Sequence, residues 1–354
     1  MSSSASRPIC SCATTPASSR RARTTPAARG CGVERADMKF GTTGIPAQSA
    51  RSHRGASRSG GTAVSPRIPV ALRSDSDIAA MRRAGSVLAS ALDAAREHCV
   101  SGCTTCELDQ IVRQAIEEQG GSPLFLGYGE RYGSGGQARP PFPAATCISI
   151  NEELVHGVPG ARVIRDGDLV SIDAGVRLDG WCADSAITVC VGDVAPERRA
   201  LVECAEDMLA HAVSAIRPGL RWSTVARGME AIACAANASI AVDFVGHGIG
   251  RELHEAPQVP NSVYASFLAQ GDFTLRPGMV LAVEPMVVLE QPKRNGIGEL
   301  VNPEVSLAAD GWTVVLASGA PSCHVEHTVA VTRDGAEVLT CRGVAGDAWR
   351  RRAG

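Results

Sequence analysis

The sequence has little aromatic content and no long apolar run. Phe, Trp and Tyr make up 4% of its 354 residues, and no stretch of 18 apolar residues occurs, so we expect no membrane-spanning helix. The formal net charge is only −2, which argues against a basic body that binds nucleic acid. A hydrophobic content of 44% with 20% charged residues excludes a wholly disordered or collagen-like chain.

The cysteines also lack an ordered pattern. They number 13, an odd count, and follow no regular spacing. A secreted disulfide scaffold is therefore disfavoured, and we expect reduced thiols in a cytoplasmic protein. His98, Cys99, Cys103 and Cys106 have the look of a zinc pattern. Because no second Cys/His pair follows at zinc-site spacing, we interpret these cysteines as small core residues.

Acidic residues are scarce in residues 1–73, which hold 12 Lys and Arg but only two acids, a balance of +10. No hydrophobic period runs through this basic arm, so we predict that it is disordered and dispensable for catalysis. Its Arg- and Ser-rich composition suits either a flexible tail or an organellar transit peptide. A third alternative is electrostatic binding to ribosomes or RNA. We expect residues 346–354 to form a flexible tail.

Hydrophobic periodicity predicts one α+β domain over residues 74–345. Helices are expected from about 74, with Ser and Asp residues as caps, and from the capping box Thr104-x-x-Glu107. A second pair is expected over 196–216 and 223–236. Strands are expected over 146–150, 169–176, 186–191, 241–245, 279–289, 313–316 and 324–331. Two helices followed by strands, twice over, indicate two similar halves.

The segment 169–191 predicts a β-hairpin that carries one aspartate on each strand. Asp179-Gly180 is a strong two-residue turn signal. With the turn there, Asp173 lies opposite Ala186. Asp173 and Asp184 are then diagonal neighbours on one face, with Cα atoms roughly 7–8 Å apart. Two such carboxylates can converge on a metal pair, although the same pattern fits solvent-exposed aspartates on an ordinary hairpin.

Three further residues favour the metal interpretation. His247 lies between two glycines, where backbones can approach closely. Glu284 and Glu326 lie in apolar runs, and a lone buried carboxylate is too costly to keep charged. With the hairpin aspartates they supply four negative charges, which two divalent cations would balance. Hard oxygen ligands with a single imidazole suit Mn, Fe, Co or Zn.

Together these motifs resemble the methionine aminopeptidases, most closely the type I enzymes of the pita-bread fold. The resemblance covers about residues 74–345. It rests on FPAATCISINEELVHGVPG at 142–160, on the aspartate pair, and on segments 246–254, 277–286, 310–314 and 326–328. It implies an α+β fold with two pseudo-symmetric helix-helix-strand halves around a curved antiparallel sheet. It also implies a monomer that removes methionine from the N-termini of nascent polypeptides.

The resemblance assigns metal ligands to individual residues. Asp173 would bind one of two divalent ions and His247 the other. Asp184 and Glu326 would bridge both. Glu284 would ligate the ion on the His247 side and also transfer protons in catalysis.

The resemblance also assigns a substrate site. His156 and His254 would lie near the scissile amide and act in catalysis without binding metal. A pocket for the methionine side chain would be walled by Tyr128, Phe142, Cys147 and Trp312, with Phe125 and Leu253 as further candidates. A mixed apolar and sulfur-containing wall favours a thioether.

Two rival functions share this fold. Xaa-Pro peptidases have the same ligands, but they typically carry a folded N-terminal domain, and residues 1–73 are too short and polar to be one. Non-catalytic relatives that bind ribosomes or RNA typically lack some ligands, and all five are present here. Both comparisons favour the methionine aminopeptidase interpretation.

Overall fold

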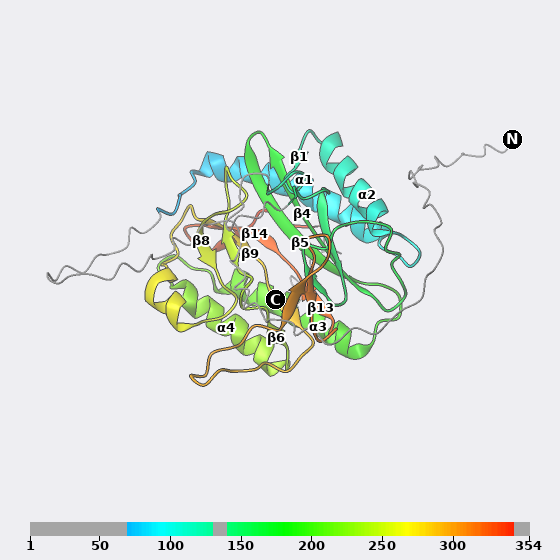
Figure 1. The fold of residues 1–354 in the computed structure, drawn as a ribbon. Coiled ribbons are helices and arrows are strands. Elements are labelled where there is room, and N and C mark those ends of the chain that lie inside the picture. Colours follow the sequence, from blue (N-terminus) through cyan, green and yellow to red (C-terminus); the bar gives the residue numbers. More distant parts are fainter. Residues whose placement is uncertain (1–68, 130–139, 343–354) are drawn as a thin grey trace, which may run out of the picture. The chain divides into compact units, whose positions relative to one another are not determined.

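Helix signals in the sequence correspond to helices in the computed structural model, which describes residues 69–129 and 140–342. In those ranges the α-helices come in two consecutive pairs (Figure 1). Ser74 and Thr104 each form a full capping box, with Asp77 and Glu107 respectively. These bonds satisfy amide groups that a helix start otherwise leaves unpaired. The pairs are α1 (Asp75–His98) with α2 (Thr105–Glu118), and α3 (Pro196–Ala215) with α4 (Trp222–Ala235).

The paired strands are antiparallel throughout the described residues and fall into four hydrogen-bonded groups. The first holds β1 (Ser122–Pro123), β2 (Thr146–Ile150), β4 (Leu169–Leu178) and β5 (Trp181–Cys190). The second holds β6 (Ser239–Ile240), β10 (Met286–Val288) and β13 (Ser322–His324), and the third holds β3 (Glu153–Val155), β11 (Val305–Leu307) and β12 (Val314–Leu316). The fourth holds β7 (Gly246–Gly248), β8 (Glu255–Val259), β9 (Val280–Val283), β14 (His327–Val331) and β15 (Ala336–Val338). A π-helical turn, η1 (Phe267–Gly271), precedes β9.

The predicted hairpin and its register are confirmed. Asp173 pairs with Ala186 and Gly175 pairs with Asp184 across β4 and β5. The turn residues Asp179 and Gly180 have φ values of 51° and 76°. Positive φ at both central residues is the geometry that suits the twist of a two-residue hairpin.

Three strand predictions need correction. The expected strand over 241–245 is wrong, because Phe244 N–H donates to Ala241 O at 3.1 Å in a turn between β6 and β7. The expected strands over 279–289 and 324–331 are each broken, at Glu284-Pro285 and at Glu326. Proline has no N–H for a sheet, and the Glu326 N–H donates across to Ala186 O of β5 at 3.0 Å. Both breaks therefore fall at predicted metal ligands.

Each helix pair covers the strands of its own half. α1 packs on β4 and β5, and α2 on β1 and β2; α3 packs on β10 and β13, and α4 on β6. Each half buries its own apolar core, and a third apolar cluster around Phe142 and Trp312 includes side chains from both halves. Contacts of β5 with β13 and β14 join the halves.

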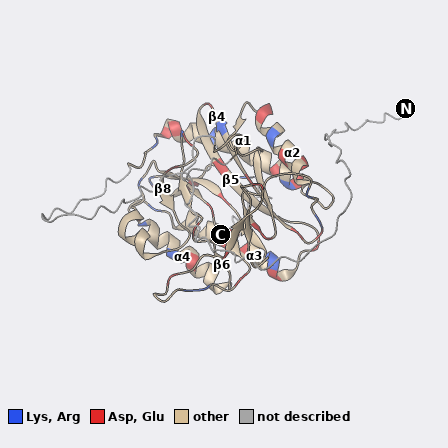
Figure 2. Ribbon diagram, in the orientation of Figure 1, with Lys and Arg blue, Asp and Glu red and all other residues tan. Residues whose placement is uncertain are grey.

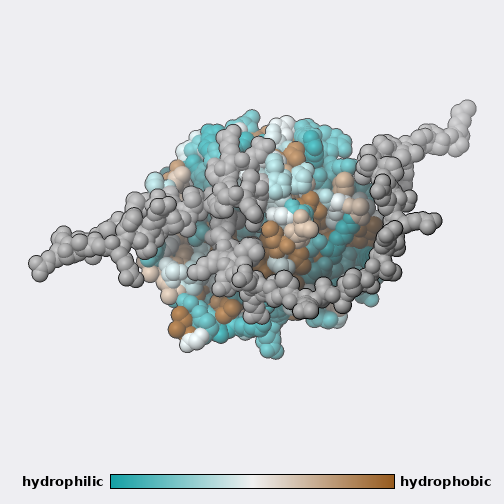
Figure 3. Space-filling model, in the orientation of Figure 1, coloured by the Kyte–Doolittle hydropathy of each residue, from teal (hydrophilic) through white to brown (hydrophobic). Residues whose placement is uncertain are grey.

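The exterior of the described residues is mixed in charge and polarity. Lys and Arg lie close to Asp and Glu along α1, α2 and α3 (Figure 2). The face seen in Figure 3 combines hydrophilic areas with smaller apolar patches. No helix among the described residues is long and apolar enough to cross a membrane. The predicted arm, apart from residues 69–73, and the predicted tail lie outside the described residues.

Candidate metal and substrate site

Three predicted metal ligands converge between the two halves. Asp184 of β5, His247 of β7 and Glu326 each offer a ligand atom, and these atoms lie within 4.8 Å of one another. His247 Nε2 is also 3.5 Å from Glu284 Oε1. In residues 69–129 and 140–342, this is the one group of at least three His, Cys, Asp or Glu side chains that is close enough to hold a metal ion.

Asp173 is the fifth member of the cluster. It lies on β4 as the diagonal neighbour of Asp184. Burial raises its pKa well above the usual range, and the charges of Asp184 and Glu284 raise it further. Asp173 therefore lies on the same face of the hairpin as Asp184, and its charge also reaches Glu326.

Burial makes the metal-free cluster costly to charge. It raises the pKa of Asp184 to about 7. Burial, with the charge of Asp184, raises the pKa values of Glu284 and Glu326 well above normal. It lowers the pKa of the His247 imidazole to about 4. All of these shifts disfavour the charged forms, as expected for ionisable groups removed from water.

The cluster passes a simple test of fit to a divalent cation. Asp173 Oδ1 and Glu326 Oε1 are buried and have no hydrogen-bond partner among the described residues. Buried polar atoms normally have partners, and an unseen ion is one reason for an exception. A cation would satisfy both oxygens and offset the clustered charge. Four carboxylates with one imidazole suit a hard or borderline ion.

Cross-strand hydrogen bonds hold the cluster's backbone. Asp184 N–H donates to Thr328 Oγ1 at 2.9 Å, and the Thr328 hydroxyl donates back to Asp184 O at 2.8 Å. Ser185 Oγ donates to Glu326 O at 2.8 Å. These bonds hold the strand that carries Asp184 next to the segment that carries Glu326.

Two groups beside the cluster were not singled out from the sequence. Arg342 is buried, donates from Nη1 to Ser185 Oγ at 2.9 Å, and its charge lowers the pKa of Glu326. His324 Nε2 is 3.7 Å from Glu284 Oε2. Arg342 lies beyond the last predicted strand, so no local pattern could have placed it here. His324 is almost completely buried.

His254 adjoins the cluster of predicted ligands without belonging to it. Its ring centroid is 4.3 Å from that of His247. Its Nδ1 shares a hydrogen bond of 2.8 Å with the Tyr128 hydroxyl. Burial and the nearby His247 and His156 lower the pKa of His254 well below the usual range, which keeps the ring neutral.

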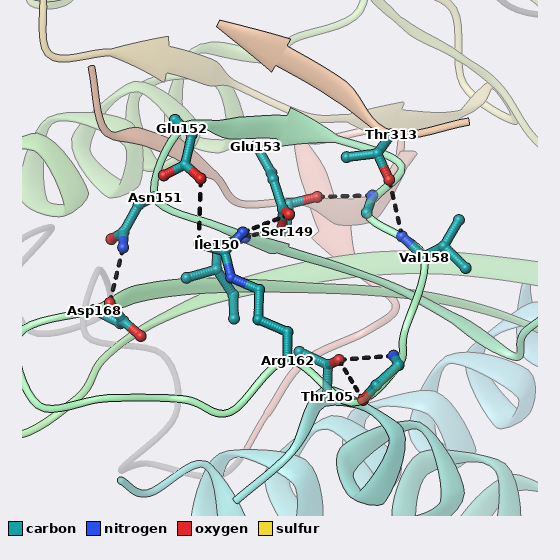
Figure 4. Close-up of polar contacts among 12 residues, drawn as sticks. Thr105, Ser149, Ile150, Asn151, Glu152, Glu153, Val158, Arg162, Asp168 and Thr313 are labelled. Carbon is teal, nitrogen blue, oxygen red and sulfur yellow. Dashed lines mark hydrogen bonds and ion pairs between the residues drawn. The ribbon is translucent and has the colours of Figure 1, made fainter. Parts of the chain in front are cut away.

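His156 is held in an unusual backbone conformation, with φ 58°. Side-chain oxygens accept the backbone N–H groups of the two residues that follow it, one of which, Val158, is labelled in Figure 4 with Ser149 and Thr313. Gly157 N–H donates to Ser149 Oγ at 3.0 Å, and Val158 N–H donates to Thr313 Oγ1 at 3.2 Å. A Cβ on Gly157 would lie 2.2 Å from a backbone oxygen of Ile148, so glycine is required there.

The predicted pocket residues pack in one apolar cluster. The rings of Phe142 and Trp312 meet edge to face with centroids 5.3 Å apart. Cys147 lies directly opposite the predicted ligand Asp173 across β2 and β4, so the apolar cluster borders the acidic one. The candidate pocket residues in the cluster are Tyr128, Phe142, Cys147, Trp312, Phe125 and Leu253.

The cysteine and histidine pattern near residue 100 forms no metal group among the described residues. Cys99 is buried in the core, as expected. Cys103 is only half-buried and Cys106 is exposed, so the core interpretation is wrong for Cys106. Cys106 lies in the first turn of α2, where its side chain receives a weak contact from Gln110.

Comparison with known proteins agrees with this geometry. The model of Metallopeptidase family M24 matches residues 79–333. The chain belongs to metallopeptidase family M24. Methionine aminopeptidase 1 of Bacillus subtilis is 37% identical over 264 residues, covering 75% of this M24 chain and 96% of the relative. The methionine aminopeptidase of Treponema pallidum is 39% identical over 271 residues, covering 77% and 96%.

Solved structures confirm the predicted fold of this M24 protein. A methionine aminopeptidase structure from Thermotoga maritima matches with a TM-score of 0.67 and 34% identity, covering 77% of this chain and 99% of the other. A prolidase from Pyrococcus furiosus matches with a TM-score of 0.57 and 21% identity, covering 77% and 66%. The second match concerns the fold alone.

Proposed function

We propose that this M24 protein is a metal-dependent aminopeptidase that removes methionine from the N-termini of nascent polypeptides. The observation that carries the proposal is the convergence of Asp184, His247 and Glu326, with Glu284 and Asp173 beside them. Similarity to proteins named methionine aminopeptidase supports the substrate. The Xaa-Pro alternative is not favoured, because the prolidase match is weaker in both sequence and structure.

The five clustered residues would hold two divalent cations, with Co, Mn, Fe or Zn as candidates. The four negative charges of the carboxylates would balance the four positive charges of two such cations, with the charge of Arg342 in addition. When bound, the cations lower the pKa of water enough to supply hydroxide near neutral pH. Asp173, Asp184, His247, Glu284 and Glu326 would be the residues that hold them.

The protein's own side chains would carry the protons. Glu284, whose side chain is only 13% exposed beside His247, would accept a proton from the attacking water and deliver it to the leaving amine. We assign the Tyr128 hydroxyl as the donor to Nδ1, which would leave the proton of the neutral His254 ring on Nε2. That N–H, together with His156, would stabilise the oxyanion that develops on the scissile carbonyl.

The apolar cluster would select the first residue of the substrate. Tyr128, Phe142, Cys147 and Trp312 present aromatic and sulfur surface beside Asp173. Such a surface favours the flexible, polarisable methionine side chain. We further propose that the protein acts as a monomer in the cytoplasm; binding of the basic arm to ribosomes remains a prediction.

A metal-reconstitution series tests this function. Chelated protein is reloaded separately with Mn, Co, Fe or Zn and assayed on a Met-Ala-Ser peptide and on an Ala-Pro peptide. We expect release of methionine with at least one cation, none after chelation, and negligible cleavage of Ala-Pro. Preferential cleavage of Ala-Pro would instead favour the Xaa-Pro alternative.

Glu284→Gln is the matched variant for this assay, because it keeps the side chain's size. Removal of the proton carrier should lower kcat by at least about 100-fold, within the range for general acid–base catalysis. Thermal unfolding should show that the variant stays folded. Turnover like that of the unmodified protein would refute the role of Glu284.

A further inference from the structure

Arg73 is the last residue of the predicted arm, yet it occupies a prepared position in the folded domain. Its N–H donates to Gly278 O at 2.7 Å. A Cβ on Gly250 would lie 1.9 Å from the Arg73 guanidinium, and a Cβ on Gly278 would lie 2.8 Å from Arg73 O. Two glycines therefore leave the room that Arg73 fills.

The guanidinium of Arg73 has two partners there. It forms an ion pair with Glu255, and the two side chains are only 12% and 19% exposed. Its Cζ also lies 5.5 Å from the ring centroid of Trp181 on β5. Deleting one partner of an ion pair that is this far removed from water costs much more folding free energy than deleting one partner of an exposed pair.

Glu255 connects this pair to the candidate substrate site. Its second carboxylate oxygen accepts the backbone N–H groups of Arg251 and Glu252 at 2.9 and 3.2 Å. The Glu255 carboxylate thereby closes the turn 251–255. This turn contains His254, which directly precedes Glu255 in the sequence. His254 in turn bonds to Tyr128 and lies against His247.

We propose that Arg73 is a positioning residue for His254. By pairing with Glu255 it holds the 251–255 turn, and through that turn it sets the imidazole against the reacting carbonyl. The inference rests on the function proposed above. It also corrects the predicted boundary of the catalytic domain, which would include Arg73 and not begin at Ser74. Residues 1–73 as a whole would then not be dispensable for catalysis.

The test compares two deletions and three substitutions in the metal-loaded protein, with Met-Ala-Ser as the substrate. Deletion of residues 2–68 should leave kcat within about twofold. Arg73→Ala, or deletion of residues 2–73, should lower kcat about tenfold with KM within about twofold, as for other groups that orient a catalytic side chain. Arg73→Lys should recover most of kcat, because an ammonium group can still pair with Glu255.

Arg83→Ala is the matched control, because Arg83 pairs with Asp179 at 3.8 Å with both side chains well exposed. Its kcat should not change. Equal effects of Arg73→Ala and Arg83→Ala, or a lower unfolding temperature of Arg73→Ala with unchanged kcat, would overturn the proposal.

Hydrogen exchange at the Arg251 and Glu252 amides gives a readout that is independent of peptide hydrolysis. Arg73→Ala should speed exchange at both amides selectively, and Arg73→Lys should restore protection. If the unmodified protein released no methionine, the proposed function would fail, while this measurement would still decide the contact. Unchanged exchange in Arg73→Ala would overturn it.

Discussion

At the scale of single residues, His156 combines strain with a place in the candidate site. A left-handed backbone costs most residues roughly 1–2 kcal/mol, and His156 has φ 58°. The bonds from the two following residues to Ser149 and Thr313 hold the loop in place (Figure 4). Strain of this kind persists where the surroundings impose it and is common at functional sites.

Substitution of His156 should separate stability from activity. His156→Gly removes the strain and His156→Ala retains it, so the alanine variant should be less stable by about 1 kcal/mol. Both should lose at least about 100-fold in kcat, because both lack the imidazole. Urea unfolding and turnover of Met-Ala-Ser measure the two effects. Full activity in either variant would remove His156 from the catalytic group.

At the scale of elements, the β4–β5 hairpin fixes the spacing of two ligands. Its ten residue pairs run without a register shift from Leu169↔Cys190 to Leu178↔Trp181. A slip of one strand by one residue against the other would place Asp173 and Asp184 on opposite faces of the hairpin. The Asp179-Gly180 turn starts this register, and buried side chains along both strands maintain it.

Gly180→Ala tests how far the turn alone controls the register. Alanine at φ 76° should lower the free energy of unfolding by about 1 kcal/mol. Methionine release should stay within about twofold, because the other pairs still align the aspartates. Gly296→Ala is the control, since its Cβ would meet nothing within 4 Å and its φ is not positive. A tenfold loss of turnover in Gly180→Ala would show that the turn is decisive.

At the scale of the whole molecule, the acidic cluster lies where the two halves meet. β5 belongs to the first half, while His247, Glu284 and Glu326 belong to the second. Folding therefore gathers four carboxylates in a buried space and forgoes their hydration. Arg342 offsets a part of this charge, and bound cations would offset the rest.

This arrangement predicts how the stability of the metal-free protein depends on pH. The pKa of Asp184 is about 7 in the folded protein and 3.8 ordinarily. The stability that this difference contributes to the folded protein is therefore lost as pH rises from about 4 through 7. The pKa of His247 is about 4 in the folded protein and 6.5 ordinarily, so this residue makes stability rise with pH, but only between those two values. Above pH 6.5 only the buried carboxyl groups still change the stability of the metal-free protein, which should therefore fall further as pH rises.

Urea unfolding at pH 6.5 and pH 8 measures this effect in chelated protein. We expect a lower midpoint at pH 8 without metal. Saturating Mn should raise the midpoint at both values and remove most of the difference, because binding favours the folded state and neutralises the acids. The same midpoint at both pH values in chelated protein would contradict the directions of these pKa shifts.

Local sequence chemistry determined the helices, their caps, the hairpin register and the identity of the five candidate ligands. Turn residues and hydrophobic periods act over a few neighbours, so they can be recognised along the chain. The strand break at Glu326 was missed because its N–H bonds to a strand in the other half, whereas Pro285 is a local signal for the break at Glu284. The tertiary structure alone placed Arg73 against Glu255 and Arg342 against Ser185, since residues about 180 and 157 positions apart meet only when long-range packing brings them together.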